Sequence, residues 1–207
     1  MKKELICRIF SRMPELETER LILRKMRVGD EEDMYAYARQ SEVTRYLLWS
    51  PHPDIYYTRD YLRYLATRYA TGSFYDWAVV LKSSGRMIGT CGFTAFDCPH
   101  DAAEIGYVLN PDYRGQGIAP EAVRAVLAFG FERLALHRIE ARFMQGNEAS
   151  LRVMEKVGMH FEGYRREAMM VKGAYRTIGY CSILRDEYAA LSAKNGENAQ
   201  KNAVFDE

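Results

Sequence analysis

The chain has 207 residues, of which 48% are hydrophobic and 28% charged, and its formal net charge is +1. These values are typical of a soluble globular protein and give no overall attraction to nucleic acid or to a membrane surface. No apolar run is long enough to span a bilayer, and the short apolar patch near the N-terminus is broken by charges, so no signal peptide is predicted.

The length fits one domain or a crowded pair, of which one domain is expected, and the cysteine usage predicts a cytoplasmic protein. Residues 16–192 are expected to form this domain, and the polar stretch 193–207 is expected to be a tail without regular structure. No Cys-x-x-Cys pair and no histidine at ligand spacing is present, which favours reduced thiols and predicts no metal site. The cysteines are Cys7, Cys91, Cys98 and Cys181.

The domain is predicted to open with a strand and two helices, after a leader of uncertain structure. Residues 17–24 contain an alternating apolar pattern that is typical of a strand. Asp30 is placed to cap a helix that ends near residue 40, and Asp54 or Thr58 can cap the next helix. Trp49 lies between these helices, where it either closes the core or lines a substrate mouth.

Two strands are predicted next. Residues 74–81 and 87–96 are rich in aromatic and β-branched side chains, and the Ser-Ser-Gly turn between them indicates a hairpin. Residues 97–103 are predicted to be a loop, in which His100 is interpreted as a solvated residue.

A glycine-rich turn organises the second half of the chain. Residues 104–109 are predicted to be a strand, residues 113–121 form the turn, and a helical apolar period follows from Val123 to Leu134. Pro120 suits the first helical turn. Free N–H groups and the positive end of the helix dipole then meet at one spot, which favours a phosphate.

The remaining elements alternate strand and helix. Residues 138–143 are predicted to be a strand, Asn147 to cap the following helix and Gly158 to end it. Strands near 161–171 and 175–184 complete the domain, which is therefore a mixed α/β fold with antiparallel hairpins and one parallel crossing.

The glycine turn fits neither of two common phosphate motifs. A Walker A loop requires Lys-Ser/Thr after Gly117, and a dinucleotide fingerprint requires a small residue where Pro120 stands. What remains is Arg114-x-x-Gly117-x-Ala119. This pattern resembles the pyrophosphate loop of the GNAT (GCN5-related) N-acetyltransferases.

Further motifs strengthen this resemblance over residues 16–190. The pattern Glu104-Ile-Gly-Tyr107 precedes the loop, and Asn147-x-x-Ser150 follows it. Both are similar to the RimJ/RimL-like ribosomal-protein N-acetyltransferase branch. Membership implies the GNAT acyl-CoA N-acyltransferase fold, an α/β (α+β) architecture whose mixed central sheet has a V-shaped splay between its central strands.

The resemblance also implies how acetyl-CoA binds. Its pantetheine arm would add to the open edge of the central strand as a false strand, and its pyrophosphate would lie on the loop. The residues expected to bind it are Tyr107, Val108, Leu109, Arg114, Gly115, Gln116, Gly117, Ile118, Ala119, Asn147 and Ser150.

Acetyl transfer to an amine needs a base for the amine and stabilisation of the thioester oxygen. Glu104 is the first candidate base, acting through a water, because some relatives place a glutamate there; its alternative is a salt bridge at the strand end. Glu167 is the second candidate, although Met169 occupies the place of the carboxylate in RimJ/RimL-like proteins. The N–H of Val108 or Leu109 is the expected oxyanion donor, directed by a bulge in the central strand.

The departing thiolate also needs a proton. Met154 stands where many GNAT enzymes carry a tyrosine acid, so that acid is missing. Ser150 takes the place of a serine found in the ribosomal branch and is expected to hydrogen-bond the thiol sulfur. The alternative is that it only caps the first turn of the helix. Asn147 is expected to hold the pantetheine as well as to cap the helix.

The function that the resemblance implies is direct acetyl transfer from acetyl-CoA to a primary amine. A protein or peptide N-terminal α-amine is favoured as acceptor, and a polyamine or antibiotic amine is the alternative. A non-catalytic acyl-CoA-binding module is a third possibility. The protein is expected to be a cytoplasmic monomer or homodimer, without metal, nucleic-acid or membrane partners.

Overall fold

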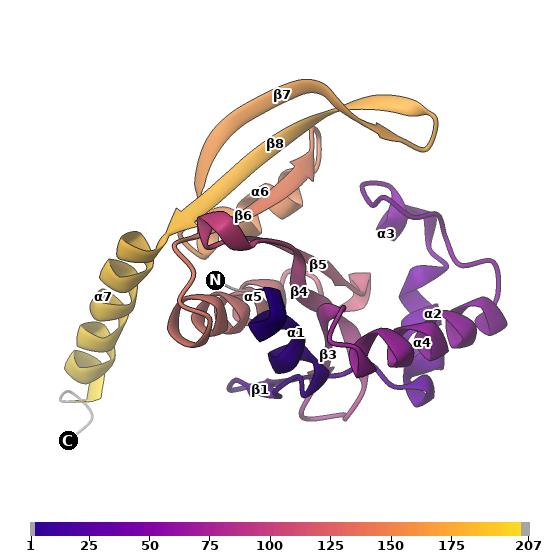
Figure 1. Cartoon of the computed structure of the whole chain (residues 1–207), viewed down its shortest axis with the longest axis horizontal. Helices are drawn as coiled ribbons and strands as arrows, with labels where there is room; N and C mark the ends of the chain where they lie inside the picture. Colours follow the sequence, from indigo (N-terminus) through magenta and orange to yellow (C-terminus); the bar gives the residue numbers. More distant parts are fainter. Residues whose placement is uncertain (1–2, 204–207) are drawn as a thin grey trace.

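The computed structural model describes residues 3–203, with side chains up to residue 194, and shows an eight-stranded sheet flanked by helices (Figure 1). The strand order is β1-β2-β3-β4-β5-β6-β8-β7. Neighbouring strands run antiparallel except β5 and β6, which are parallel. The strands are β1 Leu16–Glu17, β2 Leu21–Arg24, β3 Tyr75–Leu81, β4 Met87–Asp97, β5 Ala102–Leu109, β6 Arg138–Met144, β7 His160–Val171 and β8 Ala174–Leu184.

Helices cover both faces of this sheet (Figure 1). The helices are α1 Lys3–Ser11, α2 Glu31–Ala38, α3 Ser41–Thr44, α4 Ile55–Ala70, α5 Ile118–Ala128, α6 Glu148–Lys156 and α7 Arg185–Ala203. Trp77 of β3 faces α1 and the turn that follows α5, because its ring lies 5.5 Å from those of Phe10 and Phe129. Since side chains alternate along a strand, Asp76 faces the opposite side, toward α2 and α4.

The leader before residue 16, for which the sequence predicts no definite structure, is part of the core. Ile6 and Phe10 of α1 are buried, and Trp77 donates its indole N–H to the Pro14 carbonyl at 2.8 Å. At the other end, α7 continues through residue 203, so the polar segment after residue 192 begins as helix where the sequence predicts no regular structure.

Several local predictions are confirmed. Asp54 caps α4 by accepting the Tyr57 N–H at 2.8 Å, and Asn147 caps α6. The β3–β4 hairpin forms as predicted, while β5 begins at Ala102, inside the predicted loop. In the part of the chain that the structure describes, no helix is both long and apolar enough to cross a membrane.

The splay predicted in the middle of the sheet is present. The parallel register between β5 and β6 begins at Ala102↔Arg138 and ends at Ile105↔Ala141, after which β5 pairs only with β4. The backbone edge of β5 beyond Ile105 is therefore open on its β6 side. Because no strand pairs with this edge, its backbone N–H and C=O groups are free to bind a ligand.

The long β7–β8 hairpin bends over the opening of this splay toward α3 (Figure 1). Lys172, at the tip of the hairpin, donates from its ammonium group to the Thr44 carbonyl of α3 at 2.6 Å. This contact holds the tip of the hairpin against α3, and Met169 and Ile178 of the hairpin line the cavity on the α2–α4 side of the sheet.

Candidate active site

The glycine turn joins β5 to α5 as predicted. Gly115 and Gly117 have φ values of +75° and +76°, which glycine adopts without the strain that a side chain brings. Gly117 immediately precedes the first residue of α5, Ile118. The first N–H groups of an α-helix have no partner within it, so the turn and helix end form a cradle suited to an anion.

Arg20, which the sequence analysis does not single out, holds this cradle in place. Its guanidinium donates to the Gln116 carbonyl at 2.9 Å and forms an ion pair with Glu121 at 2.6 Å. The pair neutralises an acidic side chain in the first turn of α5. Arg114, by contrast, pairs with Glu42 of α3 at 3.1 Å and remains half exposed.

A groove of about 500 Å³ runs from this cradle along the open edge of β5 to the start of α6; we call it the cofactor groove. Of the residues predicted to bind the cofactor, Gln116 alone is not among the groove's lining residues, since its amide turns back to the Asp112 carbonyl. The predicted residues that line it are Tyr107, Val108, Leu109, Arg114, Gly115, Gly117, Ile118, Ala119, Asn147 and Ser150.

The strand register corrects one expectation about this edge. Asn110 donates its N–H to the Ile88 carbonyl of β4 at 2.8 Å, and alternate residues of a strand direct their backbone groups to the same side. The groups of Val108 therefore face β4, and those of Tyr107 and Leu109 face the open edge. The bulge nearby lies in β4, where Thr94 is the extra residue between Phe93 and Ala95, and not in β5 as predicted.

A second cavity of about 390 Å³ lies on the α2–α4 side of the sheet under the β7–β8 hairpin; we call it the acceptor cavity. Its walls are mostly aromatic and aliphatic. Trp49 packs against the core, as one of its two predicted roles requires, and it also lines this cavity, so the other role stays a prediction. The aromatic lining residues are Tyr37, Tyr46, Trp49, His52, Tyr57, Tyr61, Tyr107 and Phe143.

The two cavities meet at one place, which we call the junction. The residues that line both cavities are Tyr46, Leu47, Tyr107, Val108, Asn147 and Ser150. A molecule in the cofactor groove and a molecule in the acceptor cavity would therefore touch each other here.

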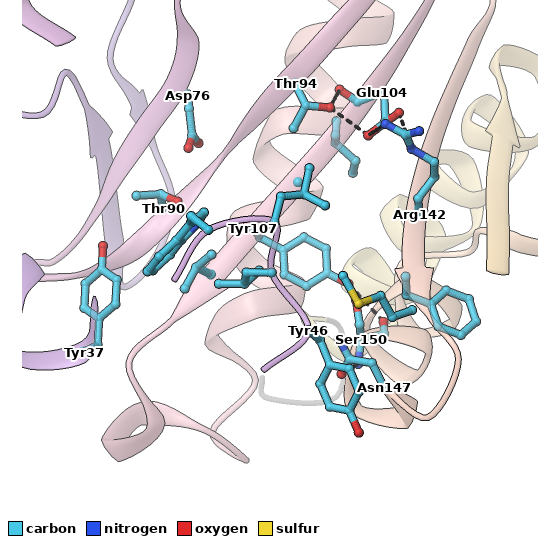
Figure 2. Close-up of a pocket in the computed structure, with 18 of the residues that line it drawn as sticks. Tyr37, Tyr46, Asp76, Thr90, Thr94, Glu104, Tyr107, Arg142, Asn147 and Ser150 are labelled. Carbon is cyan, nitrogen blue, oxygen red and sulfur yellow. Dashed lines mark hydrogen bonds and ion pairs between the residues drawn. The ribbon is translucent and has the colours of Figure 1, made fainter. Parts of the chain in front are cut away.

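The junction contains a hydroxyl pair that links β5 to α6 (Figure 2). The Tyr107 hydroxyl lies 2.9 Å from Ser150 Oγ and also 2.9 Å from the Ser150 carbonyl oxygen. Burial raises the pKa of Tyr107, so its phenol stays neutral and can donate. Asn147 caps α6, accepting from the Ser150 N–H, and Met154 is buried beside them without an acidic proton to give.

Glu104 lies at the start of the splay in a tight ion pair. Both carboxylate oxygens accept from Arg142 of β6, at 2.6 and 2.9 Å, and the Thr94 hydroxyl donates to Oε1 at 2.9 Å (Figure 2). A carboxylate has about four acceptor positions, so these three donors leave room for one more hydrogen bond. The salt bridge proposed as its alternative role therefore exists, and the side chain still borders the acceptor cavity.

The other candidate base is not brought to the site. Glu167 is exposed and lies in an irregular part of β7, with a φ of +51°, between Arg165 and Met169. Met169 lines the acceptor cavity instead. His100 is exposed beside Asp97, as its loop position predicts.

Asp76 is a carboxylate in the acceptor cavity that the sequence analysis missed. The residue retains partial exposure, its Oδ1 is shielded from solvent, and it lines the cavity opposite the junction (Figure 2). Burial raises the pKa of Asp76 from 3.8 to about 7, and the nearby Thr90 hydroxyl and Trp77 N–H lower it only in part. The side chain is thus destabilised in its charged form.

This shift has a measurable consequence for stability. The folded state holds a proton on Asp76 that the unfolded state has lost, so folding stability falls as pH rises from about 4 to about 7. We expect Asp76→Asn to remove this penalty, so that the variant gains on the order of 3–4 kcal/mol over the natural protein at about pH 8 and little at about pH 4. Urea unfolding of both proteins at the two pH values measures the gain, and an equal difference at both would contradict it.

No group of three or more His, Cys, Asp or Glu side chains suited to a metal ion occurs within residues 3–203. What the site offers is a cradle for an anion, an open strand edge and two cavities that share a junction.

Comparison with known proteins agrees with this geometry. A profile described as "Acetyltransferase (GNAT) domain" matches residues 20–160. The chain belongs to the GNAT acetyltransferase family. It is similar to the uncharacterized N-acetyltransferase p20 of Bacillus licheniformis, with 34% identity over 177 residues, which are 86% of this chain and 99% of that protein.

Solved GNAT structures share the fold. A GNAT-family acetyltransferase from Bacillus anthracis has a TM-score of 0.74 at 31% identity, covering 84% of this chain and 99% of that one. A structure of RimL, a ribosomal L7/L12 alpha-N-protein acetyltransferase in complex with coenzyme A, has a TM-score of 0.71 at 21% identity, over 84% of this chain and 99% of that one. The chain is an N-acetyltransferase with a fold that binds acyl-CoA.

Proposed function

We propose that this GNAT protein transfers the acetyl group of acetyl-CoA directly to a primary amine. The observation that carries this proposal is the junction, where the cofactor groove and the acceptor cavity share Tyr107, Asn147 and Ser150. Two substrates bound at once can react there without a covalent enzyme intermediate, because the chain supplies the proximity that the reaction needs.

The cofactor groove suits acetyl-CoA along its length. The N–H groups from Arg114 to Ala119 would bind the pyrophosphate, with the Arg20 guanidinium nearby. The backbone groups of Leu109 and Tyr107 would bind the pantetheine arm and the thioester oxygen. Of the two oxyanion donors considered, Leu109 is retained, since its N–H faces the open edge. The Ser150 hydroxyl, which pairs with the Tyr107 hydroxyl, would donate its proton to the sulfur.

Glu104 remains the candidate base. Its carboxylate has one acceptor position left for a water molecule, which can pass the proton of the amine to the carboxylate. The ion pair with Arg142 also orients Glu104, because the guanidinium fixes the direction of the carboxylate. We expect Glu104→Gln to lower kcat by on the order of 100-fold and to flatten the acidic limb of the pH–rate profile.

Arg142→Gln is the control for this prediction, since it breaks the same ion pair and leaves the carboxylate. It should lower the rate less than Glu104→Gln and keep the acidic limb. An unchanged rate and profile in Glu104→Gln would show that the base lies elsewhere.

An α-amine at a protein or peptide N-terminus is the acceptor that we favour. Its pKa of about 7.7–8.0 lies well below the value of about 10.4 for lysine, so a modest base suffices. The chain is also 33% identical over 108 residues, 52% of its length, to the putative ribosomal N-acetyltransferase YdaF of Bacillus subtilis. This similarity supports an acceptor like those of the RimJ/RimL-like branch.

A small amine is the second candidate, and the β7–β8 hairpin over the acceptor cavity favours it. Met169 and Ile178 of the hairpin line this cavity, and Lys172 holds the hairpin tip to α3, so the cavity suits an acceptor that can enter it whole. Spermidine N(1)-acetyltransferase of Escherichia coli is 25% identical to this chain over 122 residues, 59% of its length.

A thiol-release assay with acetyl-CoA and a panel of amines tests the proposed function. The panel contains peptides with free and blocked N-termini, free lysine, diamines and aminoglycosides. Release that depends on a free amine is expected. Release from none of these amines, with acetyl-CoA bound, would refute acetyl transfer to a primary amine.

A further inference from the structure

Two buried polar atoms without a partner lie in the same cavity. Among the residues that the structure describes, Tyr37 Oη and Asp76 Oδ1 are the buried side-chain nitrogen or oxygen atoms that lack a hydrogen bond. Both residues line the acceptor cavity, Tyr37 from α2 and Asp76 from β3 (Figure 2). Buried polar groups are paired in nearly all native proteins, so two unpaired groups in one cavity point to a ligand.

The chemistry of this pair selects what the ligand can be. Tyr37 is 1% exposed, and burial, followed by the nearby charge of Asp76, raises the pKa of its phenol, which stays neutral. The side chain can donate or accept one hydrogen bond. Asp76 in its charged form accepts only. A cationic group with several N–H donors satisfies both residues and offsets the cost of the buried carboxylate.

An open path leads from Asp76 toward the central strand. The register places Asp76 of β3 beside Gly92 of β4, and Gly92 beside Gly106 of β5. Strands are spaced about 4.8 Å apart, so the backbones of Asp76 and Gly106 are about 10 Å apart. Neither glycine has a side chain, and the sheet surface between the two outer residues is therefore bare.

The Asp76 carboxylate lies over this bare surface. A Cβ on Gly92 would come within 2.8 Å of Asp76 Oδ1, and a Cβ on Gly106 would come within 2.9 Å of Thr94 Cγ2. Glu104 is two residues from Gly106 on the same strand, so it is on the same face of the sheet. The two carboxylates thus border one passage, with Glu104 on the β5 side and Asp76 on the β3 side.

The walls and charges of the passage suit a cation. Tyrosine and tryptophan rings surround it, and aromatic faces attract cations. The cationic side chain on its lining is Arg142, which Glu104 neutralises. His52 also lines the cavity, and burial lowers the pKa of its imidazole, which favours the neutral form.

We propose that Asp76 and Tyr37 determine acceptor specificity by binding a second cationic, hydrogen-bond-donating group of the acceptor, while its reacting amine lies at the junction. This rests on the proposed function. Two amines separated by four or five carbon atoms lie about 6–8 Å apart when extended, which fits within the roughly 10 Å between the backbones of Gly106 and Asp76. Such a group can belong to a free diamine or to the first side chain of a peptide.

Matched acceptor pairs test this proposal. The first pair is 1,4-diaminobutane and butylamine, and the second is a peptide that begins with lysine and the same peptide beginning with norleucine. The quantity measured is the ratio of kcat/KM for the dicationic acceptor to that for its partner. The natural enzyme should prefer the dication in at least one pair, and that pair identifies the source of the group.

Asp76→Asn should lower this ratio roughly 10- to 100-fold, the size of one charge-assisted hydrogen bond, through a higher KM for the dication. Tyr37→Phe, which removes only the hydroxyl, should lower the same ratio less. Asp60→Asn is the control, because Asp60 is exposed on α4 beside Arg63, and it should leave both constants unchanged.

Three results would overturn the proposal. They are a natural enzyme without preference in either pair, a ratio that survives Asp76→Asn, and an equal loss of kcat for both members of a pair, which would make Asp76 a base. Failure of the proposed function looks different, since no amine in either pair would then be acetylated.

Discussion

Replacing Gly117 by aspartate is expected to abolish the thermal stabilisation that acetyl-CoA gives this protein. A ligand that binds only the folded state at about 100 times its Kd stabilises it by about 2.7 kcal/mol, or a few degrees in Tm. Gly117 has a φ of +76° at the start of α5, and its Cα faces open space apart from Arg20 Nη2, 3.5 Å from a built Cβ. An aspartate there brings a negative charge to the place where the helix end favours a phosphate.

The control for this variant is Gly85→Asp. Gly85 has a φ of +68° in the β3–β4 turn, with nothing within 4 Å of a built Cβ, so the substitution causes comparable backbone strain away from the groove. Without ligand, both variants should lose similar stability. Gly85→Asp should keep the full rise in Tm that acetyl-CoA causes. If Gly117→Asp also keeps this rise in Tm, the pyrophosphate does not lie on this loop.

Ser150→Ala is expected to reduce turnover roughly 10- to 1,000-fold while cofactor affinity stays nearly intact. The hydroxyl at the junction has one hydrogen-bonding partner in Tyr107 and can offer its proton to a departing sulfur. The helix end does not depend on this hydroxyl, because Asn147 supplies the cap and receives the Ser150 backbone N–H. Single-turnover rates and the acetyl-CoA Kd, measured on the same preparation, separate the two effects.

Tyr107→Phe is the companion variant, since it removes only the partner of the Ser150 hydroxyl. A smaller loss of turnover is expected than for Ser150→Ala, together with a shift of the basic limb of the pH–rate profile. Ser84→Ala, in the exposed β3–β4 turn, controls for loss of a serine hydroxyl. An unchanged turnover in Ser150→Ala would leave that residue with a structural role only.

The parts of the fold that depend on local chemistry were predictable. Asp54 and Asn147 cap helices because their side chains accept nearby N–H groups, and Gly117 allows a backbone turn that other residues resist. The order of the elements and the family motifs then suffice to predict the splay. The position of Ser150 beside the groove follows from the same motifs.

The parts that depend on strand register were not predictable. Arg142 reaches Glu104 only because β5 and β6 are parallel and Glu104 lies beside Glu140, two residues from Arg142. The apolar residues of β6 alternate with charged ones, a pattern that indicates a face either solvated or paired and does not identify a partner. Asp76 is detectable from the sequence, since it is the one charged residue in the apolar strand Tyr75–Leu81. A carboxylate in such a strand is buried at a cost and invites a functional explanation.

Direct transfer at the junction is the central claim, and intact-mass spectrometry of a single turnover tests it. Enzyme in excess is mixed with acetyl-CoA, with and without a peptide bearing a free N-terminus. The masses of the enzyme and of the peptide are then measured at successive times. With peptide, the acetyl group should appear on its α-amine as thiol is released, and the mass of the enzyme should not change. Without peptide, acetyl-CoA should stay intact. Acetylated enzyme that forms without peptide, and then passes its acetyl group to added peptide, would contradict the claim.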